Sequence, residues 1–278
     1  MSSTKGVDAV AFGEFERAAH DKIAESYHQH FSDLTSLAIA PLLAAVSVGD
    51  GSHLLEVAAG TGSLAAAAKQ RGAGRVLATD LSPNMVALAT RLHPSIEFRE
   101  ADVENLPVAE GTFDCVVCNF GLGHFPVPER AVGECVRALR RGGRLAFSWW
   151  DTPDRQRFQG LFLEAIAEAG AQAPTDIPAG PPMFRYSDDD RFAELLASAG
   201  LSSVSISTHS ANHRLDNVET LWEAGLGSLA RTGAVIRSQS DEVQHRIKSA
   251  LSALAETHIV DGALVIPVSF KVGTGLKV

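Results

Sequence analysis

Between residues 53 and 150, short apolar runs alternate with longer stretches in which apolar residues recur every third or fourth position. Short apolar runs are typical of buried strands, and the longer period is typical of helices. The expected strands are His53–Val57, Arg75–Thr79, Ile96–Arg99, Phe113–Cys118 and Arg144–Trp150, and the expected helices are Ser63–Arg71, Pro83–Leu92 and Glu129–Leu139. This alternation predicts a parallel sheet joined by right-handed crossovers, with helices on both faces.

The segments on either side of this block follow other patterns. Met1–Gly13 shows no periodicity and is expected to be irregular, and Pro41 predicts a break in the second N-terminal helix. Gly170–Pro182, which holds four prolines and two glycines, predicts a loop that covers a pocket. The expected flanking elements are helices Glu14–Phe31, Ser36–Val46, Arg155–Ala169, Asp188–Ala199, Leu215–Arg231 and Asp241–Thr257, and strands Leu201–His209 and Ala263–Lys271.

Together these elements predict an α/β fold with a doubly wound, mostly parallel sheet of seven strands and helices on both faces. Residues 1–48 would form an N-terminal helical cap, and residues 49–278 would form the sheet domain. Helical insertions at about 152–200 and 211–260 would form a lid over a substrate. Pro267 in the last strand predicts an edge position or a bulge.

Polar or aromatic residues stand at the end of every strand in the central block. They are Glu56, Asp80, Asp102, Asn119 and Trp150. Ligands of open parallel sheets bind at the carboxyl ends of the strands, so we expect these five residues to border one site.

Composition and charge exclude several classes of partner. The formal net charge is −9 at a sequence pI of about 5.6, which argues against nucleic acid as a partner. No apolar run approaches the roughly 18 residues of a membrane span, and residues 1–11 do not resemble a secretion signal. Three cysteines are typical of reduced thiols, so a cytoplasmic location is expected. Nothing in the sequence distinguishes a monomer from a homodimer.

The stretch Leu54–Leu64 reads as a strand, a glycine turn and the start of a helix, a geometry that suits a nucleotide. Gly60 and Gly62 match a dinucleotide fingerprint, and Asp80 is placed to accept hydrogen bonds from ribose hydroxyls, so NAD and adenosyl ligands both fit. Glu56 would repel a pyrophosphate but attract an ammonium group, and Asp102 can accept from an adenine amine. Three acidic residues, with no lysine or arginine to bind a phosphate, therefore favour S-adenosylmethionine as the ligand, with S-adenosylhomocysteine as its product.

Five segments of Leu54–Trp150 resemble, in order, motifs of the class I S-adenosylmethionine-dependent methyltransferases of the ubiquinone/menaquinone-methyltransferase-like (methyltransferase type 11) subfamily. They read L-L-E-V-A-A-G-T-G, T-D-L-S-P-N-M, A-D-V-E-N-L-P, F-D-C-V-V-C-N-F-G-L-G-H-F and L-R-R-G-G-R-L. Ala59 departs from the Cys or Gly of many relatives. The resemblance implies a Rossmann-like fold and a transferase of methyl groups to a small metabolite.

The resemblance also implies a role for each residue that matches a motif. The methionine portion of the cofactor would be surrounded by Glu56, Ala58, Gly60 and Gly62, and the ribose would be bound by Asp80, with Leu81 and Met85 beside the adenosine. The adenine would be held by Asp102 and Val103. The transferable methyl group would lie near Asn119 and Phe120, and Tyr27 would close over the cofactor.

The acceptor side carries fewer signals. His124 is the titratable residue nearest the end of the fourth strand. It has two possible roles. It is either a base or hydrogen-bond donor that acts on the methyl acceptor, or a structural residue that caps the loop before Pro126. Glu164 on the following helix is either a base or part of a solvated face. The other candidates for an apolar acceptor wall are Trp150, Phe158, Phe162, Met183, Phe184 and Tyr186.

No metal site is expected. His20, His28 and His30 lack a second pair at zinc-like spacing, and Cys115 and Cys118 point to opposite faces of a strand. The sequence therefore predicts methyl transfer to a small apolar or aromatic metabolite of the secondary-metabolite, quinone or isoprenoid type. The alternatives are a protein of the same fold that binds the cofactor as a scaffold or for a non-methylating reaction, and an NAD-dependent oxidoreductase.

Overall fold

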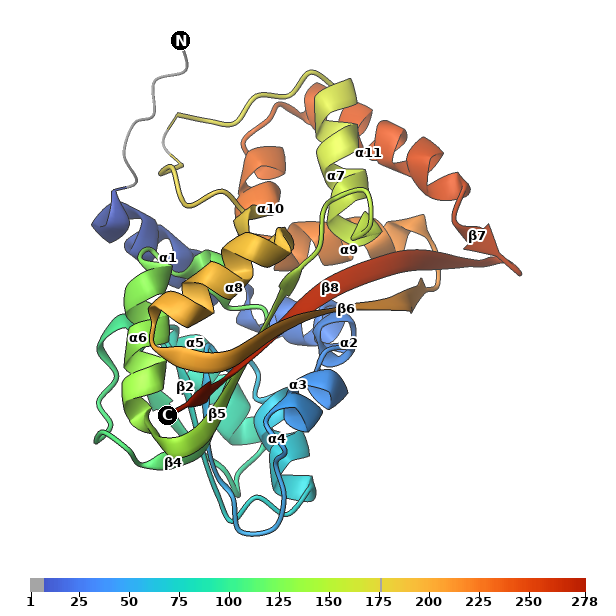
Figure 1. Cartoon of the computed structure of the whole chain (residues 1–278). Helices are drawn as coiled ribbons and strands as arrows, with labels where there is room; N and C mark the ends of the chain where they lie inside the picture. Colours follow the sequence, from blue (N-terminus) through green and yellow to red (C-terminus); the bar gives the residue numbers. More distant parts are fainter. Residues whose placement is uncertain (1–7, 176) are drawn as a thin grey trace.

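The computed structural model describes residues 8–175 and 177–278. Within these residues the strands form one sheet in the order β3-β2-β1-β4-β5-β8-β6, with β7 paired to β8 (Figure 1). The strands are β1 (His53–Val57), β2 (Arg75–Asp80), β3 (Glu97–Glu100), β4 (Phe113–Cys118), β5 (Leu139–Trp150), β6 (Leu201–Leu215), β7 (Ile259–Val260) and β8 (Ala263–Lys277). The described sheet thus has eight strands rather than the predicted seven, because the two-residue β7 gives no periodic signal.

The first five strands are parallel to one another, and β8 runs antiparallel between β5 and β6. The helices are α1 (Ala9–His30), α2 (Ser32–Ser36), α3 (Ile39–Ala45), α4 (Ser63–Gln70), α5 (Pro83–Leu92), α6 (Pro128–Ala138), α7 (Arg157–Glu168), α8 (Asp189–Ser198), α9 (Val218–Ser228), α10 (Ala230–Arg237) and α11 (Asp241–Glu256). Helices α4 and α5, which connect β1 to β2 and β2 to β3, pack with α3 on one face of the sheet, and α6 and α8 pack on the other (Figure 1). The predicted doubly wound α/β fold is confirmed.

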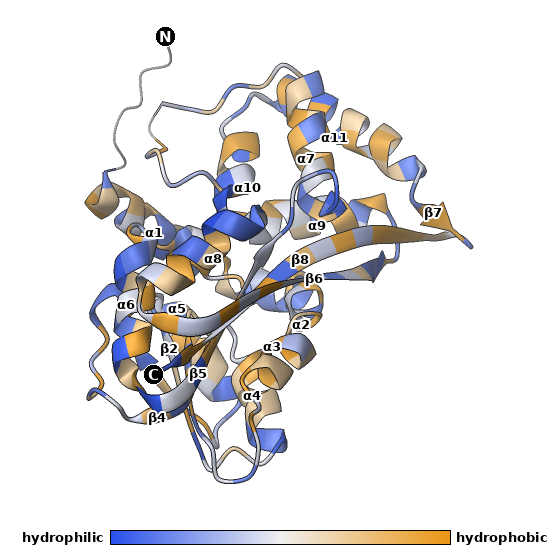
Figure 2. Cartoon of the chain, viewed as in Figure 1, coloured by the Kyte–Doolittle hydropathy of each residue, from blue (hydrophilic) through white to orange (hydrophobic). Residues whose placement is uncertain are grey.

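Figure 2 shows that apolar residues gather on the central strands and on the helix faces turned toward them. This burial follows from the sequence, because strands covered on both faces must be apolar along most of their length. Strand β4 is an example, since Val116, Val117 and Cys118 in succession are inaccessible to solvent. None of the described helices is long and apolar enough to cross a membrane.

Helix α1 begins earlier than predicted. The Asp8 carboxylate accepts hydrogen bonds from the amides of Val10 and Ala11, which caps the helix at Ala9. The expectation of an irregular segment is therefore wrong for residues 8–13, and its first seven residues lie outside the described part of the chain. The predicted helix Ser36–Val46 is interrupted at residues 37–38, before Pro41, and α3 runs through Pro41, whose missing N–H cannot donate to the carbonyl of Leu37.

Strands β5, β6 and β8 are longer than predicted because strand pairing extends further than the local pattern shows, and β8 ends at Lys277 rather than Lys271. Strand β5 begins at Leu139, where it pairs with Phe113, and continues through Gly142 and Gly143, whereas the predicted strand begins at Arg144. Strand β6 continues to Leu215 because β8 extends beyond β5 and gives it a partner.

The predicted helix Leu215–Arg231 is in fact two helices, α9 and α10, which meet at an extended Leu229. Pro267 lies in the part of β8 that projects beyond β5 and is paired with β6 on one side, which agrees with the predicted edge character.

Candidate active site

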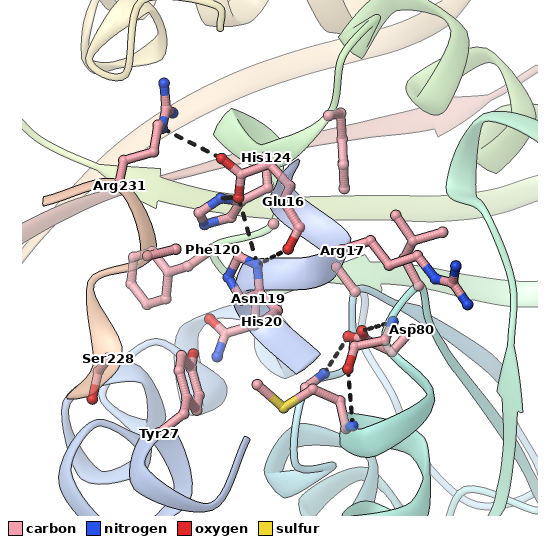
Figure 3. Close-up of a pocket in the computed structure, with 18 of the residues that line it drawn as sticks. Glu16, Arg17, His20, Tyr27, Asp80, Asn119, Phe120, His124, Ser228 and Arg231 are labelled. Carbon is pink, nitrogen blue, oxygen red and sulfur yellow. Dashed lines mark hydrogen bonds and ion pairs between the residues drawn. The ribbon is translucent and has the colours of Figure 1, made fainter. Parts of the chain in front are cut away.

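A pocket opens at the carboxyl ends of β1, β2, β4 and β5, beneath α1, α9 and α10 (Figure 3). Its empty volume is about 1170 Å³, part of it open to solvent. Residues predicted to bind a cofactor line one part of it: Tyr27, Ala58, Gly60, Asp80, Leu81, Met85, Asp102, Val103, Asn119 and Phe120.

The turn after β1 is tied to the end of β2 by hydrogen bonds. The amide of Gly60 donates to Asp80 Oδ2 at 2.8 Å, and the amide of Ser82 donates to Asp80 Oδ1 at 2.9 Å. Both oxygens are therefore fixed in direction, although each retains a lone pair for a ligand. Burial raises the pKa of the Asp80 carboxyl, and these two amides partly offset that effect. At the next strand end, Asp102 Oδ1 accepts from the Glu104 amide at 2.8 Å, which caps the short turn that follows.

Two predicted cofactor residues lie behind the pocket wall. Gly62 has φ of +82° and is the N-cap residue of α4, and a Cβ there would lie 2.6 Å from the Phe98 ring. Glu56 is buried; burial raises the pKa of its carboxyl to about 8, and the charge of Asp80 adds to this, while a hydrogen bond from the Ala65 amide opposes it. Among the described residues, Glu56 Oε2 has no hydrogen-bond partner. An orphaned buried carboxylate oxygen at this point fits a ligand that carries an ammonium group.

The backbone next to the pocket is strained at two non-glycine residues. Ala58 at the end of β1 has φ of 52°, and Phe120 after β4 has φ of 55°. Such conformations persist where the surrounding structure fixes them, and they cluster at functional sites. Ser148 on β5 helps to fix the second one, since its hydroxyl accepts from the Phe120 amide and donates to Asn119 Oδ1.

Aromatic side chains form the apolar wall of the pocket. Phe120 stacks on Trp150 with ring centroids 3.6 Å apart, and Tyr27 and Trp150 both contact the ring of Phe31 edge-on. Burial raises the pKa of the Tyr27 hydroxyl to about 12, so the hydroxyl stays neutral. Stacked aromatic faces suit a cationic ligand and a flat apolar one equally well.

A second group of polar side chains lies on the side of the pocket away from Asp80 (Figure 3). His124 Nδ1 lies 2.9 Å from Glu16 Oε2, and Arg231 Nε on α10 lies 3.4 Å from Glu16 Oε1. His20, one turn beyond Glu16 on α1, packs edge-on against His124 with ring centroids 4.8 Å apart. Ligand atoms of Glu16, His20 and His124 lie within 4.8 Å of one another, a spacing that a metal ion could also use.

Sequence reasoning named His124 but missed Glu16, His20 as a pocket residue, and Arg231. One signal was present: Glu16 shares the buried face of α1 with Phe12 and Ile23, where a carboxylate needs a partner. The partners themselves could not be identified, because Glu16 and His124 are 108 residues apart in sequence.

The remaining acceptor candidates divide into two groups. His124, Trp150 and Met183 line the pocket. Phe158 and Phe162 are fully buried on α7, Tyr186 is buried against Phe192, and Phe184 is partly buried against the core, so none of these four lines it. Glu164 is ion-paired to Arg157 with Nη1–Oε1 at 2.6 Å and also lies outside it. This placement removes Glu164 as a candidate base.

Comparison with known proteins agrees with this geometry. Residues 55–147 match a family model described as a methyltransferase domain. Proteins named demethylmenaquinone methyltransferase from Renibacterium salmoninarum and Paenarthrobacter aurescens are each 30% identical over 58% of the chain, and the matches cover 71% and 66% of their own lengths. The chain thus spans about two thirds of the length of these relatives.

A solved structure shows the same fold. It is a putative methyltransferase from an antibiotic biosynthesis pathway of Anabaena variabilis, with a TM-score of 0.59 at 20% identity, over 85% of this chain and 96% of that one. With the Renibacterium match, the family model and the strand-end pocket all in agreement, the chain belongs to the S-adenosylmethionine-dependent methyltransferases, in the group that includes the demethylmenaquinone methyltransferases.

Proposed function

We propose that the protein transfers a methyl group from S-adenosylmethionine to a small aromatic acceptor of the quinone type. The observation that carries the proposal is the division of one pocket into two parts. One part has the polar strand ends around Asp80 and Asp102, which we call the donor half. The other has Trp149, Met183 and the cluster around Glu16, which we call the acceptor half.

The donor half fits the cofactor in its hydrogen-bonding groups. Asp80 would accept from the ribose hydroxyls, Asp102 from the adenine amine, and the free oxygen of Glu56 would face the ammonium group. Tyr27 lies across from the glycine turn, 4.0 Å from where a Cβ of Gly60 would stand, and would close that side. When bound, the cofactor supplies a methyl group on a positively charged sulfur. The protein then has to hold the attacking atom in line with that methyl group and keep water away.

The acceptor half favours a flat apolar ligand. Trp149 and Trp150 are buried aromatic residues at this point, and Phe120, which stacks on Trp150, joins them to the donor half. The names of the 30%-identical relatives make a demethylmenaquinone-like ring the first acceptor to test. We further propose a cytoplasmic location, which the three buried free cysteines support because free thiols persist in reducing compartments.

The test is a methylation assay with S-adenosylmethionine and a reduced demethylmenaquinone that carries a short side chain. We expect the product to be heavier by one methyl group in place of hydrogen, with one S-adenosylhomocysteine formed per turnover. Product formed without consumption of cofactor would instead support a non-methylating reaction. A thermal shift with NAD but not with S-adenosylhomocysteine would contradict the donor assignment.

A further inference from the structure

Glu16 and His124 form a hydrogen-bonded pair in the pocket wall, and the histidine is its more exposed member. His124 Nδ1 lies 2.9 Å from Glu16 Oε2. The Glu16 side chain is 3% exposed and that of His124 is 31% exposed, so the imidazole is the partner that a ligand can reach more easily. An imidazole that faces a cavity and is backed by a buried carboxylate is the arrangement that general-base catalysis uses.

The charges around the pair favour its basic form at neutral pH. Burial raises the pKa of the Glu16 carboxyl, but His124, His20 and Arg231 more than offset this and hold it below its ordinary value. Burial lowers the pKa of the His124 imidazole; Glu16 opposes that effect, while His20 and Arg231 add to it. Across the pocket, Asp80 faces both histidines. A carboxylate therefore meets a neutral imidazole, which donates its Nδ1 proton and keeps the lone pair on Nε2.

The ring of His124 is held in place by packing. The rings of His20 and Trp149 contact it edge-on, with centroids at 4.8 and 5.6 Å. The adjacent Gly123 packs so closely on Trp149 that a Cβ there would lie 2.1 Å from the indole. Since the Nδ1 partner comes from α1, the ring does not act as a cap of its own loop, which was the alternative role considered for it from the sequence.

A metal ion is the other occupant that this cluster suggests, and the surrounding charges disfavour it. Arg231 places a guanidinium 3.4 Å from Glu16 Oε1, where it would repel a cation. His20 Nδ1 is bonded to the main-chain carbonyl of Glu16 at 2.8 Å, which leaves only its Nε2 for a metal.

We propose that His124 is the general base of the reaction, that Glu16 is its positioning residue, and that the acceptor therefore carries an acidic hydroxyl, as a hydroquinone or other phenol does. This inference rests on the proposed function. The hydroxyl proton passes to His124 Nε2. The electron pair released on the oxygen, or on the ring carbon conjugated with it, forms the new bond to the methyl carbon.

The methyl donor and the protein base each change charge in this step. The carbon–sulfur bond breaks with its electron pair left on sulfur, so the sulfonium becomes a neutral thioether. Glu16 stabilises the imidazolium until its proton is released to water. If carbon is the attacking atom, that ring carbon then loses its own proton to regain aromaticity, and the ring oxygen takes up a proton from water, so one proton is released overall.

The first test is the pH dependence of kcat/KM with the reduced demethylmenaquinone, in His124→Gln and Glu16→Gln. His124→Gln should lower kcat/KM by about 10²–10⁴-fold at pH 7 and make the rate rise with pH as the acceptor ionises unaided. Glu16→Gln should lower it by roughly 10–10³-fold and move the rising limb to lower pH, because loss of the carboxylate lowers the pKa of His124. His245→Gln, at an exposed histidine of α11, is the matched control and should behave as wild type.

Folding and cofactor binding are checked in each variant by thermal melting and by calorimetry with S-adenosylhomocysteine. The affinity should match wild type in both variants, and both should melt cooperatively, with a lower melting temperature in Glu16→Gln because Arg231 loses its buried partner. Overlapping pH profiles for wild type and both variants would overturn the proposal. Activity lost to a chelator and restored by added Zn²⁺, Mn²⁺ or Fe²⁺ would also overturn it, in favour of a metal site.

A second measurement does not depend on the acceptor. NMR titration of His124 in the protein without substrate should give a pKa below the ordinary value of 6.5, a proton on Nδ1 in the neutral form, and a lower pKa in Glu16→Gln. If this result is obtained but the quinol is not methylated, the proposed acceptor fails and the base assignment stands. A proton on Nε2, or an unchanged pKa in Glu16→Gln, removes the assignment whatever the acceptor is.

Discussion

The donor and acceptor halves of the pocket are built in different ways. In the donor half, Gly60, Asp80 and Asp102 follow successive strands, and backbone amides fix their positions. In the acceptor half, Glu16 on α1, His124 after β4 and Arg231 on α10 meet through side chains alone. A site fixed by its backbone tolerates few conformations and binds one ligand class, whereas a site fixed by side chains can change its ligand by substitution.

The halves also differ in how their charges are neutralised. Asp80 is balanced by amide dipoles and remains the charge that a ligand meets. Glu16 is balanced by Arg231 and the two histidines, so a ligand meets an imidazole instead. The following predictions test whether the two halves can be altered separately, beginning with the largest expected effect.

Asp80→Ala should weaken binding of S-adenosylhomocysteine by roughly 100-fold, because hydrogen bonds to a charged group contribute about 1.5–3 kcal/mol each. Calorimetry measures the affinity directly. The matched control is Asp21→Ala, since Asp21 accepts from Ser82 and Asn84 beside the same turn but lies outside the pocket. The control should bind within about threefold of wild type. Equal losses in both variants would mean that Asp80 acts only by supporting the turn.

Gly62→Ala should lower the free energy of unfolding by about 2–4 kcal/mol. About 1–2 kcal/mol comes from the left-handed backbone at φ of +82°, and the rest from overlap with the Phe98 ring. Gly142→Ala provides the comparison, because Gly142 has φ of +75° but no atom within 4 Å of its Cβ position. Urea unfolding should show about 1–2 kcal/mol for this control. Equal losses at the two positions would exclude crowding as a cause.

Glu56 should make the ligand-free protein less stable as pH rises from about 5 to 8. Its carboxyl titrates near 4.5 when unfolded and near 8 when folded, so the folded state binds the extra proton in this range. The slope can reach about −1.4 kcal/mol per pH unit. Glu56→Gln should flatten the curve in a series of urea unfolding experiments. Parallel curves for the two proteins would show that the side chain is ionised in the folded state.

Glu164→Gln should change kcat/KM by less than about twofold, because the side chain is paired with Arg157 outside the pocket. Loss of a half-exposed ion pair should cost at most about 1 kcal/mol of unfolding free energy. Steady-state kinetics and thermal melting measure both. A drop in kcat of tenfold or more would return Glu164 to the list of candidate bases.

The donor half was largely predictable because its positions follow from local pattern. The bounds of β1 and β4 agree with the prediction, and Asp80 and Asp102 follow their strands as expected. A parallel strand order turns such local positions into a common edge without any knowledge of side-chain contacts.

The acceptor half was not predictable to the same degree. Phe158 and Phe162 have the same apolar spacing that a pocket wall would have, but α7 buries both of them in the core. A helical period shows that a face is covered and does not show whether protein or ligand covers it. Glu16 required knowledge of how α1 crosses the loop after β4, a contact that no local pattern encodes.

Helix α1 contributes to both halves, since Tyr27 faces the glycine turn and Glu16 faces His124. The two residues are eleven positions apart, about 16 Å along the axis, on one rigid rod. One helix therefore borders both ligands. Any free energy that the first ligand spends in seating α1 would not have to be spent again for the second, and each ligand would then raise the affinity for the other by the same factor.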